Sequence, residues 1–235
     1  MSKAVLAVIF VTILMAVPVL AASEDSKSNL EKVMFVHYKN GAEKHYFATA
    51  DTTTATSSSN CYKLMGVKWP SLPVSYVINP TNKEGLSSKF VTSAVSRAAE
   101  TWDYSTSKEL FRNTYSVDSS AKYGVQNYKN TISFGSYPST SVIAITYVWY
   151  TKTTKQIVEF DMLFNSYFAW GNASTNRSKM DLQGIATHEF GHSIGLGDLY
   201  NSCTKETMYS YSTAGETLKR TLNKGDITGL RKIYG

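Results

Sequence analysis

The chain has few of the features that mark several large classes of protein. It holds only two cysteines and four histidines in 235 residues. Its formal net charge of +6 comes from lysines and arginines that are scattered along the sequence, and the absence of a basic stripe argues against a nucleic-acid partner. Beyond the first 20 residues no apolar run is long enough to span a bilayer. We therefore expect neither nucleic-acid binding nor a membrane anchor in the mature protein.

The N-terminus has the pattern of a secretory signal peptide. Lys3 precedes an apolar run from Ala4 to Leu20, and the run closes in small residues that suit signal peptidase. We predict a signal peptide at residues 1–21 and a secreted, extracellular product. The alternative is an uncleaved anchor helix that tethers the protein, although about 17 apolar residues would be at the lower limit for crossing a bilayer.

Residues 22–60 are predicted to form an N-terminal extension. Two extended runs within 33–48 flank Asn40-Gly41, which is a hairpin signal. The polar tract at 51–60 has no apolar face to bury and is the best candidate for a linker. A short propeptide, a strand-adding extension and a spacer all remain open.

Residues 61–235 are predicted to form one α+β domain. Strands alternate with amphipathic helices, and their order suggests a mostly extended layer between helices. The last helix has a clear start, with Asn223 as N-cap and Asp226 three residues later. The other predicted elements are strands at 74–78, 131–137, 141–150 and 156–165, a helix at 86–102 and a helix that begins near Met180.

The segment HEFGHSIGLGD, residues 188–198, concentrates groups that bind metals. On a helix, His188 and His192 project from the same face because residues four apart are neighbours there. Their imidazoles then have the separation that two ligands of one zinc ion require. Glu189 lies one step round the helix, where it can hold a metal-bound water and serve as the general base of a zinc peptidase.

A third donor completes a zinc site that keeps one tetrahedral position open. In an uninterrupted helix His188 and Asp198 would lie about 15 Å apart along the axis. Gly195 can end the helix with a positive φ angle and so let the backbone return Asp198 to the metal. We therefore predict that His188, His192 and Asp198 bind zinc.

The competing interpretation is a structural helix that happens to carry polar residues. Buried imidazole and carboxyl groups need partners, however, and a metal ion supplies them. The helix is predicted to be buried by its apolar residues Ile185, Ala186, Phe190 and Ile194. We favour the metal site.

These residues resemble the extended signature of the metzincin zinc peptidases, HExxHxxGxx followed by a third ligand and later by a turn that contains methionine. Met208, in ETMYS, matches that turn. Within the clan the chain looks most like the matrixins and their microbial relatives, and the resemblance covers residues 61–235. The flanking segments that carry it are KLMGVKW, VSYVINP, IVEFDMLFN and LNKGDITGLRKIYG. It implies a zincin-like catalytic domain with a twisted, mostly parallel sheet, an antiparallel edge strand, an active-site helix and a C-terminal helix.

The chain departs from the matrixin pattern at three points. Asp198 stands where matrixins have histidine, as in the snapalysin-like group, and an anionic oxygen donor still suits zinc. The other two histidines, His37 and His45, precede the predicted domain. The additional structural zinc of animal matrixins therefore has no ligands here. The cysteine-switch motif of the family is absent around Cys61.

The resemblance implies a secreted zinc endopeptidase that hydrolyses internal bonds of extracellular proteins, with Glu189 as base and Met208 as an apolar floor under the ligands. By the same resemblance, the strand at 141–150 would be the edge strand that pairs with extended protein or peptide substrates, and plain core structure is its alternative. We expect a monomer, and calcium could brace loops through Asp161 or Glu159. The rival function is an inactive secreted zinc-binding or surface module, which the intact base disfavours.

The two cysteines, Cys61 and Cys203, admit more than one state. Export favours a disulfide between them, which would close a long loop and stabilise the fold. Cys61 could instead be a thiolate that caps the metal and keeps the enzyme latent. Free or intermolecular thiols are the third option.

Overall fold

The computed structural model describes residues 29–42 and 58–235. The predicted signal peptide, the second arm of the predicted hairpin and most of the predicted linker lie outside these residues. The strands are β1 (Leu30–Lys39), β2 (Val77–Ile78), β3 (Ser116–Val117), β4 (Thr131–Gly135), β5 (Val142–Thr151), β6 (Ile157–Asn165), β7 (Trp170–Gly171), β8 (Met180–Asp181) and β9 (Tyr211–Ser212). The helices are α2 (Ser88–Asp103), α3 (Leu182–Ser193), the 3-10 turn η1 (Leu218–Arg220) and α4 (Lys224–Tyr234).

The main sheet has seven strands in the order β3-β2-β4-β6-β5-β1-β9. The pairs β3-β2, β2-β4, β4-β6 and β1-β9 are parallel, whereas β5 is antiparallel to both of its neighbours. The predicted α+β fold with a mostly parallel sheet is therefore confirmed. β5 does not lie at the edge as predicted, because β1 and β9 continue the sheet beyond it.

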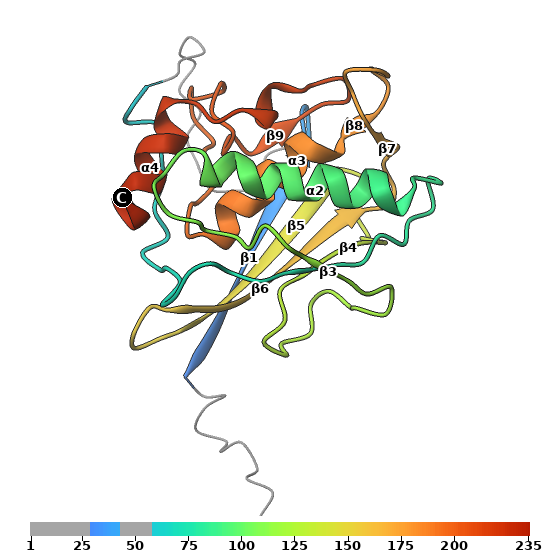
Figure 1. The fold of residues 1–235 in the computed structure, drawn as a ribbon. Coiled ribbons are helices and arrows are strands. Elements are labelled where there is room, and N and C mark those ends of the chain that lie inside the picture. Colours follow the sequence, from blue (N-terminus) through green and yellow to red (C-terminus); the bar gives the residue numbers. More distant parts are fainter. Residues whose placement is uncertain (1–28, 43–57) are drawn as a thin grey trace, which may run out of the picture.

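The helices α2 and α3 pack against each other on one face of the sheet (Figure 1). In α2 the apolar side chains recur at spacings of three and four residues, and Ser87 caps its first turn by accepting a hydrogen bond from Phe90 N at 3.2 Å. At the other end, the indole of Trp102 is fully buried and donates to Thr187 O on α3 at 2.8 Å. None of the helices in the described residues is long and apolar enough to cross a membrane.

The first strand, β1, comes from the N-terminal extension and lies inside the sheet of the main domain. It runs antiparallel to β5, from the pair Leu30–Thr151 to the pair Tyr38–Val142 (Figure 1). At its end, Tyr38 and Lys39 pair in parallel with β9. Among the roles left open for the extension, the structure thus shows strand addition for Leu30–Lys39.

Candidate metal centre

The helix α3 carries the histidines and glutamate of the motif in a fully enclosed position. Asp181 caps it by accepting a hydrogen bond from Gly184 N at 2.8 Å, and Arg220 in turn pairs with that carboxylate. Because α3 is buried on nearly all sides, its polar side chains must be satisfied inside the protein. His188, Glu189 and His192 are each 0% exposed.

A sharp bend after α3 brings Asp198 back to the two histidines. Gly195 has a φ angle of +101°, a conformation that glycine adopts without penalty. A Cβ atom at this position would also overlap the carbonyl oxygen of Val67. The bend therefore depends on glycine for two independent reasons, and it leads directly to the buried Asp198 side chain.

Three side-chain atoms converge at one point. His188 Nε2 and His192 Nε2 lie 3.1 Å apart. Asp198 Oδ1 lies 3.2 Å from the first nitrogen and 3.5 Å from the second. Ligands arranged tetrahedrally around zinc at about 2.0–2.2 Å stand roughly 3.3–3.6 Å from one another. The spacing of these donors therefore fits one zinc ion.

The hydrogen bonds of the two histidines fix which ring nitrogen faces that point. His188 Nδ1 lies 2.7 Å from Thr207 O, and His192 Nδ1 lies 2.9 Å from Leu196 O. A carbonyl oxygen only accepts, so each Nδ1 donates and each Nε2 keeps its lone pair for a metal. Asp198 Oδ1 is buried without a hydrogen-bond partner in the described residues. A cation would satisfy all three atoms together.

The protonation states of His188 and Asp198 agree with metal binding, whereas the Asp198 carboxylate outweighs burial and raises the pKa of His192. Burial lowers the pKa of His188 to about 4, which keeps its ring neutral. Burial alone would raise the pKa of Asp198, but the facing His192 and His188 outweigh it and hold that pKa well below the ordinary value. The site therefore offers a neutral imidazole and a carboxylate, the forms in which these side chains bind zinc.

Glu189 lies beside the ligands but its carboxylate is held by other groups. The hydroxyl of Thr146, on β5, donates to Glu189 Oε2 at 2.6 Å. His37 Nδ1, on β1, lies 3.3 Å from Glu189 Oε1. Burial raises the pKa of Glu189 to about 7. A carboxyl group with such a pKa can take up and release a proton near neutral pH.

Met208 lies under α3, against Gly191. A Cβ atom on Gly191 would overlap the Met208 sulfur and approach the Trp102 ring to 2.7 Å. The turn that carries this methionine is held from below by Asp226 of α4, which accepts from Thr207 N at 2.8 Å and Met208 N at 3.1 Å. The start of the last helix thus fixes the floor of the site.

Comparison with known proteins identifies the family. A family model described as matrixin matches residues 68–235 of the chain. The chain belongs to the matrixin family. Matrixins are zinc-dependent metallopeptidases. The family therefore uses the metal that the spacing of the three donors in this chain fits.

Curated relatives of this matrixin include the hatching enzyme of Paracentrotus lividus, at 29% identity over 198 residues, or 79% of this chain and 31% of that protein. Metalloendoproteinase 1 of Glycine max is 43% identical over 58 residues, or 25% of this chain and 18% of the relative. Neutrophil collagenase of Homo sapiens is 37% identical over 75 residues, or 32% and 15%. The chain spans less than a third of the length of these relatives.

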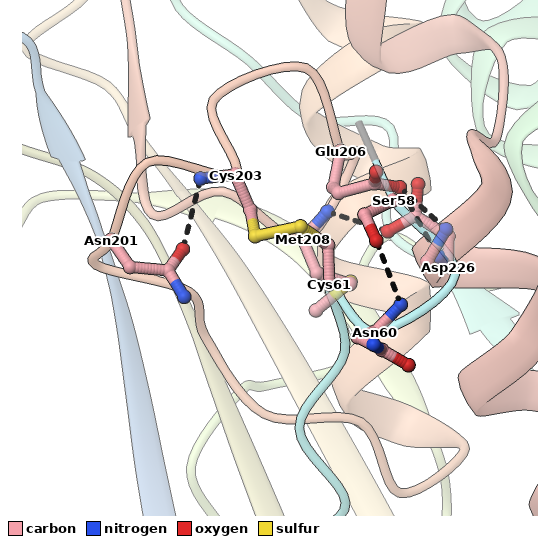
Figure 2. Close-up of a disulfide and its surroundings, with 9 residues drawn as sticks. Ser58, Asn60, Cys61, Asn201, Cys203, Glu206, Met208 and Asp226 are labelled. Atoms are coloured by element: carbon pink, nitrogen blue, oxygen red, sulfur yellow. Dashed lines mark hydrogen bonds between the residues drawn. A yellow bond between two sulfur atoms is a disulfide. The ribbon is translucent and has the colours of Figure 1, made fainter. Parts of the chain in front are cut away.

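A disulfide joins Cys61, seven residues before the segment that matches the matrixins, to the loop between Asp198 and Met208 (Figure 2). Cys61 and Cys203 are bonded, with their Cα atoms 5.7 Å apart. Neither thiol is therefore available to cap the metal. Figure 2 shows that this bond lies close to the Met208 turn and Asp226, so it ties the ligand-bearing loop to the body of the protein.

Sequence reasoning missed two residues of the extension that reach the matrixin site. His37 is 0% exposed, and its ring centroid lies 3.9 Å from that of His188. Phe35 stacks on His192, with ring centroids 4.0 Å apart. One signal was present: in an extended strand, residues 35 and 37 point to the same side. No pattern in the neighbouring sequence indicated that this side of the strand would contact His188 and His192.

The carboxylates proposed for calcium have other partners in this matrixin. Asp161 accepts from Gly124 N at 2.6 Å and Thr131 N at 3.0 Å, and Glu159 accepts from Asn127 N at 2.8 Å. Both carboxylates are buried. They order the loop before β4 by hydrogen bonding, a role that requires no ion.

Proposed function

We propose that this matrixin is a secreted zinc endopeptidase that hydrolyses internal peptide bonds of extracellular proteins. The observation that carries the proposal is the convergence of His188 Nε2, His192 Nε2 and Asp198 Oδ1 within 3.1–3.5 Å, with the Glu189 carboxylate beside them. Family membership supports both the metal and the reaction class.

Bound zinc would lower the pKa of a coordinated water and polarise the carbonyl group of the scissile bond. Glu189 then accepts the proton of the water and passes it to the leaving amine. Thr146 holds Oε2 of Glu189 in place by a hydrogen bond. Oε1 is the oxygen that takes the proton, and it becomes free to do so when His37, which now lies beside it, moves away. Met208 contributes an apolar floor and takes no part in proton transfer.

Several further features belong to the same proposal. Residues 1–21 act as a cleaved signal peptide, residues 22–60 form an extension or propeptide, and residues 61–235 form the catalytic domain of a monomer. Protein or peptide substrates pair with β5 through main-chain hydrogen bonds. The proposal also includes calcium near Asp161 and Glu159, which thermal melts with and without a calcium-selective chelator would test.

The test uses the folded chain with a protease site engineered within residues 51–57. Casein hydrolysis is measured before and after the chain is cut there, because β1 covers the site in the intact chain. We expect zinc-dependent hydrolysis by the cut protein. Glu189→Ala should lower it by at least roughly 100-fold, the contribution of a general base, and leave the zinc content unchanged.

Equal casein hydrolysis by the cut Glu189→Ala protein would refute the assignment of the base. No hydrolysis by the cut wild-type protein loaded with zinc would favour the rival function, an inactive secreted zinc-binding module. Metal analysis of both proteins distinguishes a missing base from a missing metal.

A further inference from the structure

Lys219 is a buried lysine whose side chain ends beneath the candidate metal centre. It lies on η1, the 3-10 turn that packs against α3, and only 3% of its surface is exposed. The next residue, Arg220, pairs with Asp181, whereas Lys219 makes no ion pair with any carboxylate in the described residues. Lysine is almost never enclosed without a partner for its charge. Other polar groups must therefore hold this ammonium.

The ammonium of Lys219 is held by carbonyl oxygens of the turn that carries Met208. Its Nζ donates to Thr207 O at 3.1 Å and also to Tyr209 O. Thr207 O is at the same time the acceptor that faces His188 Nδ1 at 2.7 Å. A single carbonyl oxygen therefore accepts from both the lysine and a candidate zinc ligand, and the two donors share its electron density.

Acidic side chains around Lys219 keep it protonated at neutral pH. Burial lowers its pKa to about 8, and the carboxylates of Glu216, Asp226, Asp198 and Glu189 oppose that shift. They come from the loop before η1, from α4, from the loop after α3 and from α3 itself. Because this pKa stays above 7, the ammonium form predominates in a neutral solution.

A positive charge at this place opposes the charge of a bound metal ion. The path from Nζ through Thr207 O and the His188 ring puts the metal position at most roughly 10 Å away. Even at the dielectric constant of water, a single positive charge and a divalent ion at that distance repel enough to lower affinity about fourfold. The hydrogen bond acts in the same direction. An acceptor already engaged by an ammonium supports the His188 ring less, which makes the ring a weaker electron donor.

We propose that Lys219 is a positioning residue that keeps the bound zinc electrophilic, acting through Thr207 O and His188. This inference rests on the proposed function, because the zinc ion and its ligands are those assigned there. The Asp198 carboxylate brings a full negative charge to the metal, which weakens the pull of the ion on the electrons of a substrate carbonyl. The charge of Lys219 opposes that effect. Lys219 thus makes zinc binding weaker and the polarisation of the carbonyl stronger.

The first experiment measures zinc affinity in the full chain by competition with a chelator, at about pH 6.5, which is below the pKa of Lys219. Lys219→Met removes the charge and keeps a side chain of similar length, whereas Lys219→Arg keeps the charge. Lys224→Met is the matched control, because Lys224 is exposed and its loss changes the net charge equally. Lys219→Met should bind zinc at least roughly threefold more tightly, and the other two variants should stay within about twofold of wild type.

Equal or weaker zinc binding by Lys219→Met would overturn the proposal, because a lysine that only supports the Met208 turn loosens the site when it is removed. Should Lys219→Met fail to fold, Lys219→Gln takes its place with the same expectation, since it is also uncharged.

The hydrogen bond of His188 gives a second readout that is independent of activity. In zinc-loaded protein with ¹⁵N-labelled histidine, the Nδ1–H proton of His188 is followed by NMR. Its signal should move downfield in Lys219→Met, because Thr207 O is released from the ammonium and accepts more strongly from the ring. Lys224→Met should leave the signal in place. An unchanged signal in Lys219→Met would overturn the coupling through Thr207.

Casein hydrolysis by zinc-saturated protein that has been cut within residues 51–57 separates this inference from the proposed function. Lys219→Met should lower kcat at least roughly threefold with KM within about twofold of wild type, and Lys219→Arg should restore kcat. Tighter zinc binding with an unchanged kcat would overturn the proposal. No hydrolysis by the cut wild-type protein, with zinc affinity still raised in Lys219→Met, would refute the peptidase assignment and support the effect of Lys219 on the metal.

Discussion

Removal of the Cys61–Cys203 disulfide tests how the site is held to the rest of the protein. The bond links residues 142 positions apart. It anchors the loop that runs from Asp198, the third zinc ligand in our proposal, to the Met208 turn. The double variant Cys61→Ser, Cys203→Ser removes the crosslink with little change in side-chain volume. We expect it to lose global stability and, through the loosened loop, some affinity for zinc.

The expected loss of stability follows from the length of the closed loop. In the chain-entropy model a loop of this size restricts the unfolded chain by about 5 kcal/mol. For a domain of this size, each kcal/mol corresponds to about 2–4 °C in the melting temperature. The double variant should therefore melt roughly 10–20 °C below the wild-type protein.

The measurement is denaturant unfolding, followed by circular dichroism and tryptophan fluorescence, with zinc saturating and again with chelator. Agreement between the two probes is needed before a free energy is derived. Wild-type protein reduced in denaturant is the control, because it lacks the bond but keeps both sulfur atoms. A loss below about 1 kcal/mol in the double variant and in the reduced protein would refute the reasoning.

Three other predictions follow from the site and the core. Asp198→Ala should release zinc from purified protein, whereas Asp198→His should retain it; unchanged zinc stoichiometry in Asp198→Ala would place the third ligand elsewhere. Gly191→Ala should lower stability by about 1–3 kcal/mol through overpacking against Met208, and an unchanged melting temperature would contradict this. Burial raises the pKa of Asp103 to about 6 from an ordinary 3.8, so the stability that its proton provides is complete below about pH 4 and is lost as the pH rises through 6. Asp103→Asn should therefore flatten the dependence of stability on pH between 4 and 6, and an unchanged slope would show that another group titrates there.

Local patterns were sufficient to predict the helices and the long strands. The spacing of apolar residues placed a helix at 86–102, and the structure has α2 at Ser88–Asp103. The expected cap of the last helix is also present, with Asn223 N donating to Asp226 Oδ2 at 2.9 Å. These features depend on residues within a few positions of one another, which a single sequence displays directly.

The pairing of strands and the length over which they pair were harder to predict than whether a segment forms a helix or a strand. The run at 74–78 suggested a five-residue strand, but only Val77–Ile78 forms β2, and Val74 makes an isolated bridge to Phe111. Alternating apolar residues show which side of a strand is buried. They do not show how long the neighbouring strand is, and β3, which pairs with β2, has two residues.

The same distinction applies to the candidate site. The motif at residues 188–198 predicted three donors because a helix and one glycine bend set their separation locally. His37 meets Glu189 across 152 positions of sequence. That contact depends on the register of β1 against β5, which no short pattern encodes.

The place of β1 between β5 and β9 limits what could occupy its position in the sheet. In the described residues β9 joins the sheet only through β1. Neighbouring strands lie about 4.8 Å apart, so departure of β1 leaves a slot about 9.6 Å wide between two backbones. An α-helix with its side chains is about 10–12 Å across and offers no free backbone groups to the slot's two edges. If the proposed endopeptidase function is correct, a folded helical substrate must unwind locally before it fits, and the rate at which it is cut follows the free energy of that local unfolding.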